Sequence, residues 1–123
     1  MFRVLSYNKM KKTLLSLLLC ALPTVASAYV EKNTAVFRVL NKDAGKVSEH
    51  KVALNQSFKF EKLNIVVRSC KQSDPFDAEN FWAFVEINDT DAGRVFSNWM
   101  DRNEPGKKPM QHADYDVWLV KCE

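Results

Sequence analysis

The chain has 123 residues, of which 46% are hydrophobic and 27% charged, and its 18 Lys and Arg against 15 Asp and Glu give a formal net charge of +3. A chain of this length has room for one ordinary domain and excludes a multidomain enzyme. Its basic residues are scattered singly among acids. This pattern argues against nucleic-acid binding, because that function needs Lys and Arg gathered on one face.

The first 28 residues predict a secretory signal peptide. The basic pair Lys11 and Lys12 precedes an apolar run over residues 13–22, and small residues at positions 26 and 28 form a cleavage site. The run is too short for a membrane-spanning helix, which needs about 20 apolar residues. We therefore expect export, cleavage after Ala28 and no transmembrane segment after cleavage.

Removal of residues 1–28 changes the net charge of the chain. Translation can start at either Met1 or Met10, since both precede the apolar run. The leader holds four basic residues and no acidic one, so residues 29–123 carry 14 basic and 15 acidic side chains. The basic excess belongs to the leader, as does Cys20. Residues 29–123 are predicted to form a single β-domain.

Short runs with period-two alternation fill residues 29–123, separated by turn residues such as Gly45 and Gly93. Seven strands are predicted in chain order, at Thr34–Leu40, Val47–Leu54, Phe58–Phe60, Leu63–Lys71, Phe81–Ile87, Arg94–Trp99 and Tyr115–Cys122. The expected fold is all-β, a small antiparallel sandwich or barrel of about seven strands. The segment Met100–Ala113 has two prolines, a glycine and few apolar residues, which predicts a long surface loop of the kind that often carries function.

Two cysteines, Cys70 and Cys122, remain after removal of the leader. In an oxidising compartment, a pair far apart in sequence predicts one disulfide. The alternative is a redox or metal-binding thiol pair, but the chain has no C-x-x-C spacing and no histidine within a few residues of either cysteine. We expect a structural bridge.

Strand alternation places Arg68 on the same side as Cys70, and Asp116 on the same side as Cys122. If the bridge is buried, both charges are drawn inward and need partners, because an unpaired interior charge costs several kcal/mol. We therefore consider Arg68 and Asp116 a candidate structural ion pair. The alternative is two exposed charges at a sheet margin, since parity alone does not decide which face is inside.

Aromatic residues are abundant in this short chain, with eight Phe, three Trp and three Tyr. Most must lie in the core, but the predicted strand Phe81–Ile87 has large rings on both faces. Trp82, Trp99 and Met100 are therefore the candidate interaction surface.

Catalytic and metal-binding motifs are weak. His112, Asp114 and Asp116 form the one cluster of His with acids, and in an extended strand they would share a face that could hold a metal or a general base. The D-x-D-x-G pattern at 89–93 lacks the acidic twelfth ligand of a calcium loop and predicts a hairpin turn instead. We expect no enzymatic activity, no metal site and no cofactor.

Several motifs carry a family resemblance: Arg38-Val39-Leu40 with Gly45-Lys46-Val47, then Val67-Arg68-Ser69-Cys70, Val95-Phe96-Ser97-Asn98-Trp99-Met100, and Tyr115-Asp116-Val117-Trp118-Leu119-Val120-Lys121-Cys122. In this order they resemble the domain of unknown function numbered 2155, a family of small exported proteins, mainly of alphaproteobacteria. The resemblance implies a periplasmic protein with paired cysteines and implies no activity. Family members tend to have Gly in place of Asn98 and Pro in place of Ala113, which weakens any role that needs a rigid His112.

Three functions remain open. The first is a non-enzymatic module for protein interaction or envelope assembly, which binds another envelope protein through the aromatic residues beside the predicted loop. The second is a small-ligand or glycan-binding domain that uses the same rings, and the third is an envelope hydrolase built on His112 and Asp116. A flat exposed strip would favour the first function, and an enclosed Trp-lined pocket with a few polar groups the second.

Overall fold

The computed structural model describes residues 29–123, so the predicted signal peptide and its cleavage site lie outside the described residues. Eight strands form in this part of the chain: β1 (Val30–Lys32), β2 (Thr34–Asn41), β3 (Lys46–Ala53), β4 (Ser57–Phe60), β5 (Leu63–Gln72), β6 (Phe81–Asp89), β7 (Gly93–Asp101) and β8 (Tyr115–Cys122). The all-β prediction is confirmed. None of residues 29–123 belongs to a helix that could cross a bilayer.

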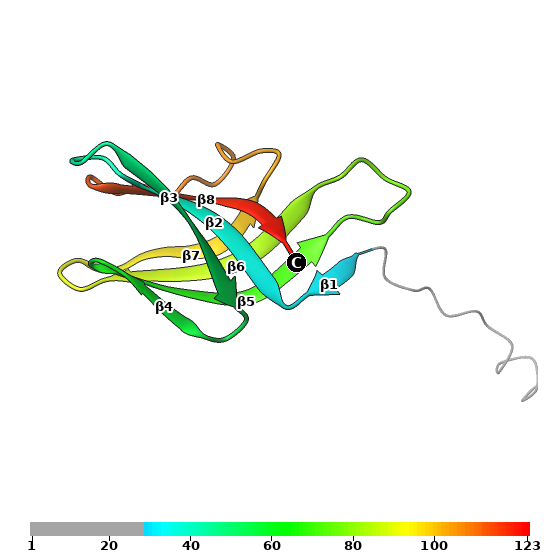
Figure 1. The fold of residues 1–123 in the computed structure, drawn as a ribbon, viewed down its shortest axis with the longest axis horizontal. Coiled ribbons are helices and arrows are strands. Elements are labelled where there is room, and N and C mark those ends of the chain that lie inside the picture. The colour runs from blue at the N-terminus through cyan, green and yellow to red at the C-terminus, as the bar shows by residue number, and fades with distance from the viewer. Residues whose placement is uncertain (1–28) are drawn as a thin grey trace, which may run out of the picture.

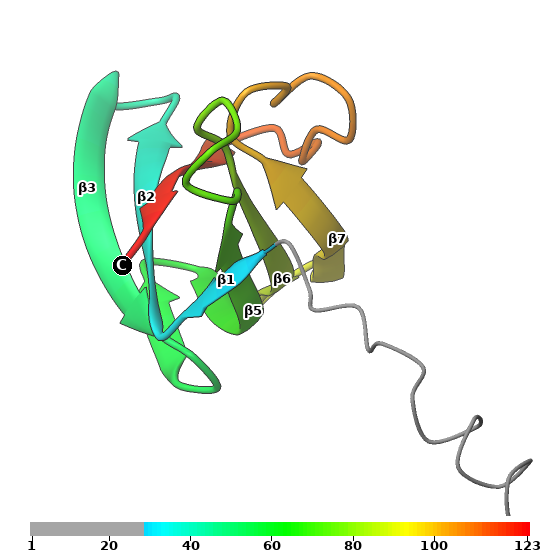
Figure 2. The ribbon, with the colours of Figure 1, turned by 90° about the vertical axis from the view of Figure 1, so that its right-hand side faces the viewer.

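The strands form two antiparallel sheets that pack face to face as an open sandwich (Figures 1 and 2). The larger sheet has the order β1-β5-β6-β7, and β4 lies beside β5 on the edge that β1 also uses. The smaller sheet has the order β3-β2-β8. Within the described residues, β7 and β8 are therefore each hydrogen-bonded to a neighbour along one edge only.

Side-chain alternation builds the core between the sheets. In β6 every second residue from Phe81 to Ile87 is buried, and in β8 Tyr115, Val117 and Leu119 are buried in the same way. The intervening residues of β6 and β8 are half-buried or exposed. A two-sheet sandwich needs one apolar face per sheet, and the period-two pattern supplies it.

The tight turns follow from residues that tolerate or stabilise a reversed backbone. Gly45 and Gly93 have φ values of +65° and +77°, a region that glycine enters without steric cost. Before the second turn, Asp89 Oδ1 accepts hydrogen bonds from the N–H groups of Asp91 and Ala92 at 2.7 and 3.1 Å. The D-x-D-x-G segment is thus the hairpin turn that we expected between β6 and β7.

A buried disulfide joins the two sheets. Cys70 of β5 and Cys122 of β8 are bonded, with their Cα atoms 5.7 Å apart, which confirms the predicted pair. A β-bulge precedes each cysteine, because Arg68 is an extra residue opposite β6 and Val120 an extra residue opposite β2. Each bulge reverses the side-chain alternation, so both cysteines face the core.

Candidate functional site

A pocket of about 470 Å³ opens between β7, β8 and the loop over residues 102–114. It brings together all three tryptophans of the chain, Trp82 from β6, Trp99 from β7 and Trp118 from β8. Met110 lines it from the loop, and acidic and basic loop residues stand at its margin. We call this cavity the tryptophan pocket.

Two strand edges form the walls of the tryptophan pocket. Trp99, Met100 and Asp101 line it from β7, and the unbroken run Asp116–Leu119 lines it from β8. Successive residues of a strand point to opposite faces, so a run of neighbours can line one cavity only where the cavity meets the strand's edge. The pocket therefore lies against backbone as well as side chains.

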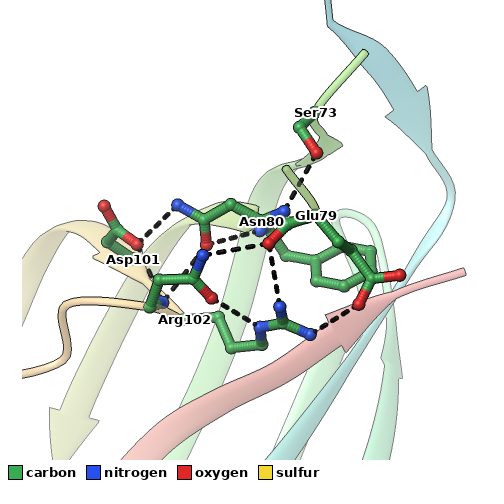
Figure 3. A network of polar contacts seen from close by, with 7 residues as sticks. Ser73, Glu79, Asn80, Asp101 and Arg102 are labelled. Atoms are coloured by element: carbon green, nitrogen blue, oxygen red, sulfur yellow. Dashed lines mark hydrogen bonds and ion pairs between the residues drawn. The ribbon is translucent and has the colours of Figure 1, made fainter. Parts of the chain in front are cut away.

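A polar network fastens the start of the 102–114 loop to the loop between β5 and β6, and both loops lie at the same end of the sandwich (Figures 2 and 3). Asn80 is its centre: its side-chain N–H donates to Asp101 at 2.9 Å, while its side-chain oxygen accepts from the Phe81 and Asn103 N–H groups. Arg102 donates to the side chain and the carbonyl oxygen of Glu79 at 2.9 and 3.0 Å.

Asp101 links this network to the pocket. Burial raises the pKa of its carboxyl, but hydrogen bonds from Asn80, Asn103, Glu104 and Trp82 more than offset that effect and leave the pKa below its ordinary value. The indole N–H of Trp82 donates to Asp101 Oδ2 at 3.2 Å. The carboxylate thus orients a pocket ring while it holds the first turn of the loop.

A second anchor holds the far end of the loop. His112 Nδ1 accepts a hydrogen bond from the Asp114 N–H at 3.0 Å, so the ring proton is on Nε2, which donates to Asp89 Oδ2 at 2.7 Å. The Lys42 ammonium donates to the His112 carbonyl at 2.7 Å. Met110 is buried in the core between the two anchors, so the exposed stretch 104–109 is pinned on both sides.

Asp89 is ionised throughout the ordinary pH range. Hydrogen bonds from the Asp91 N–H, the His112 ring and the Ala92 N–H lower the pKa of its carboxyl to about 2. The same carboxylate therefore closes the β6–β7 turn and holds His112.

The three residues predicted as an interaction surface differ in exposure. Trp99 is 36% exposed, and Phe84 and Lys71 flank its ring, with the Phe84 ring centroid and the Lys71 ammonium each 5.5 Å from its own centroid. Trp82 is half-buried, with the Tyr29 ring 5.2 Å away. Met100 is buried in the core, because it points to the opposite face of β7 from Trp99.

The structure does not join Arg68 to Asp116. Arg68 is exposed, 3.4 Å from Glu86 and 3.1 Å from the Asn55 side chain, whereas Asp116 lies 3.9 Å from Lys42. The bulges explain the difference. The predicted pair assumed unbroken alternation up to each cysteine. Because each strand has one extra residue before its cysteine, the Arg68 and Asp116 side chains face away from the buried bridge.

The cluster of His112, Asp114 and Asp116 does not form a shared site. His112 turns toward Asp89, and Asp116 faces Lys42. Among residues 29–123, no three His, Cys, Asp or Glu side chains converge closely enough to hold a metal ion.

Sequence reasoning missed the residues that support the pocket. Asn80 and Asp101 lie 21 residues apart, and neither belongs to a recognisable motif. Trp118 could be noted as aromatic but not placed beside Trp82 and Trp99, because it belongs to the other sheet. The proline-containing loop was the one usable signal, and it does border the pocket.

The chain matches the model of a known protein family. Residues 35–122 match the model of a family described as an uncharacterized protein conserved in bacteria, DUF2155. This range includes every residue of the tryptophan pocket, both cysteines and both loop anchors. No curated protein and no solved structure matches the chain.

Proposed function

This chain belongs to the DUF2155 family, and we propose that it is a non-catalytic interaction domain of the bacterial envelope whose tryptophan pocket receives an apolar group of a partner protein. The observation that carries the proposal is that three tryptophan residues from two sheets line one open cavity. Tryptophan supplies the largest apolar contact area of any side chain and is enriched where partners bind most tightly.

The anchored loop also supports binding. Both ends of the 102–114 loop are held by hydrogen bonds, at Asn80 and at His112, and Met110 is packed into the core. A wall that is already ordered loses little conformational entropy when a partner docks. The cavity is thus ready for an occupant.

The disulfide supports placement in the periplasm. A bridge between Cys70 and Cys122 forms and persists in an oxidising compartment, and the leader over residues 1–28 has the pattern of an export signal. We therefore propose that the partner is another envelope protein.

Site-directed crosslinking tests the proposal. A photoreactive phenylalanine analogue at Lys108, on the pocket rim, should capture a specific envelope protein in living cells, and the same analogue at Phe76 should not. Phe76 is the matched control because it is 97% exposed and lies outside the pocket lining. Trp99→Ala should abolish the Lys108 adduct and Phe76→Ala should preserve it. Equal adducts from both positions, or an adduct that survives Trp99→Ala, would count against the pocket.

Glycan binding is the second candidate, because indole faces and carboxylates commonly hold sugar rings and Asp101, Glu104 and Asp116 border the pocket. We rank it below a protein partner, since Asp101 already accepts four hydrogen bonds and the other two carboxylates each have a nearby lysine. Titration with glucose and N-acetylglucosamine oligomers, followed by tryptophan fluorescence, separates the two. Saturable binding that Trp99→Ala removes would favour the glycan.

We do not propose the hydrolase, since both ring nitrogens of His112 are engaged in hydrogen bonds.

A further inference from the structure

We propose that the partner presents an extended segment, which adds as a further strand to the free edge of β8 and inserts one side chain into the tryptophan pocket. This inference rests on the proposed function and names the form of the partner. It follows from the direction of the backbone groups along β8.

The ladder between β2 and β8 fixes which groups are free. The Lys42 N–H donates to the Asp114 carbonyl at 2.8 Å, and antiparallel neighbours exchange hydrogen bonds at every second residue. Because Asp114 bonds to Lys42, next to β2, Asp116 two residues later bonds to β2. The backbone N–H and C=O groups of Val117 and Leu119 therefore point away from β2. These outward groups belong to the run that lines the pocket.

In the described part of the chain, the outward groups have no neighbouring strand to pair with. Within residues 29–123, β8 pairs with β2 alone, and Val117 and Leu119 both line the open tryptophan pocket. Backbone donors and acceptors that lack a protein partner are the groups that strand pairing satisfies. An added strand would supply the missing donors and acceptors, as in other domains that bind peptides by strand addition.

The opposite wall is less suited to the same mode of binding. The Arg102 N–H donates to the Phe81 carbonyl, so Arg102 and every second residue before it in β7 bond to β6. Trp99 lies between such positions, and its backbone N–H and C=O therefore point to the free edge of β7. The Asn98 side chain, however, already accepts the Trp99 N–H at 2.8 Å. A donor that already has an acceptor gains less from an added strand, so we assign the added strand to β8.

The pocket also selects side chains. Alternate residues of an added strand point to the same side, so one of them enters the cavity among Trp82, Trp99 and Trp118. An aromatic or large aliphatic residue fits this lining. Lys107 lies 3.8 Å from Glu104, whereas Lys108 has no ion-pair partner among the described residues, which favours an acidic residue beside the apolar one.

The test uses ten-residue peptides selected from a random display library against residues 29–123, then synthesised with single N-methylated amides. N-methylation removes one donor and leaves the side chain intact. We expect alternate positions to lose about tenfold in affinity, the equivalent of one hydrogen bond, and the positions between them to change little. Hydrogen exchange should slow about tenfold or more at the amides of Val117 and Leu119, and should not change at Val47 and Glu49 on edge strand β3.

The possible failures are distinguishable. Peptides that bind, lose binding in Trp99→Ala and Trp118→Ala, but tolerate N-methylation at every position would overturn strand addition and leave the proposed function standing. Peptides that bind equally well to both Trp variants, or a library that yields no binder, would count against the proposed function itself. Trp99 is partly exposed, so its variant tests the pocket even if Trp118→Ala does not fold.

Discussion

His112 and Asp89 form a nearly buried hydrogen-bonded pair, with 10% and 5% of their side chains exposed, that fastens the 102–114 loop to the β6–β7 hairpin. The two residues are 23 positions apart in the sequence. Because Asp89 also closes its own turn, the hairpin and the loop share one carboxylate.

Asp89→Asn should therefore destabilise the protein in a pH-dependent way. The pKa of Asp89 in the folded protein is about 2, below its value of about 4 in an unfolded chain, so its ionised form stabilises the fold above pH 4. That contribution is lost as the pH falls through about 2. The difference in melting temperature between wild type and variant should be largest near pH 7 and shrink between pH 4 and pH 2.

Asp91→Asn is the control for this series. Asp91 is exposed and pairs with Lys62 at 3.1 Å on the surface, so its substitution should change the melting temperature little. An Asp89→Asn difference that stays constant down to pH 2 would contradict the linkage.

Removal of the disulfide should cost about 4 kcal/mol of unfolding free energy, because the bridge closes a loop with a sequence separation of 52 residues. Urea denaturation of the double variant Cys70→Ala with Cys122→Ala measures this cost. Wild type unfolded in reductant should match the variant. A loss below about 1 kcal/mol would mean that the unfolded chain gains little freedom when the bridge is absent.

Asn80→Ala should lower the unfolding free energy by about 1–3 kcal/mol, because it leaves the Phe81 N–H without its acceptor and removes a donor from the Asp101 carboxylate. Amide exchange over residues 102–104 should become faster. Glu79→Gln weakens an exposed ion pair in the same network and should cost under about 1 kcal/mol. Equal effects of the two variants would remove Asn80 from the centre of the network.

A double-mutant cycle separates the expected partner of Arg68 from the observed one. Arg68 with Glu86 should give a coupling energy of about 0.2–1 kcal/mol, typical of an exposed pair. Arg68 with Asp116 should give a value near zero, because each has a different neighbour. Chemical denaturation of the single and double variants provides both numbers. A larger coupling to Asp116 would restore the pair predicted from alternation.

The sequence predicted the strands well because burial on one face leaves a period-two pattern that can be read locally. The predicted Thr34–Leu40 and Val47–Leu54, for example, correspond to β2 and β3 within one residue at each end. β1 was missed because Val30, Glu31 and Lys32 form no apolar run, and pairing with the end of β5 defines the strand.

Register was less predictable than strand position. Nothing in Val67-Arg68-Ser69-Cys70 shows that Arg68 is an extra residue, since a bulge arises from pairing with the neighbouring strand. The pocket was predictable only in its local features. Aromatic excess and a proline-rich loop are local features, whereas the approach of Trp118 to Trp99 depends on how two sheets pack.

The position of the sulfur bridge has a mechanical consequence. β8 is hydrogen-bonded to β2 along one edge, and its Cys122 is bonded covalently to Cys70 of β5. A force on β8 is therefore transmitted to both sheets. If tension from a bound partner separates β8 from β2, the covalent link at Cys122 still holds the strand to β5. The strand therefore stays attached to the larger sheet for as long as the bridge is intact.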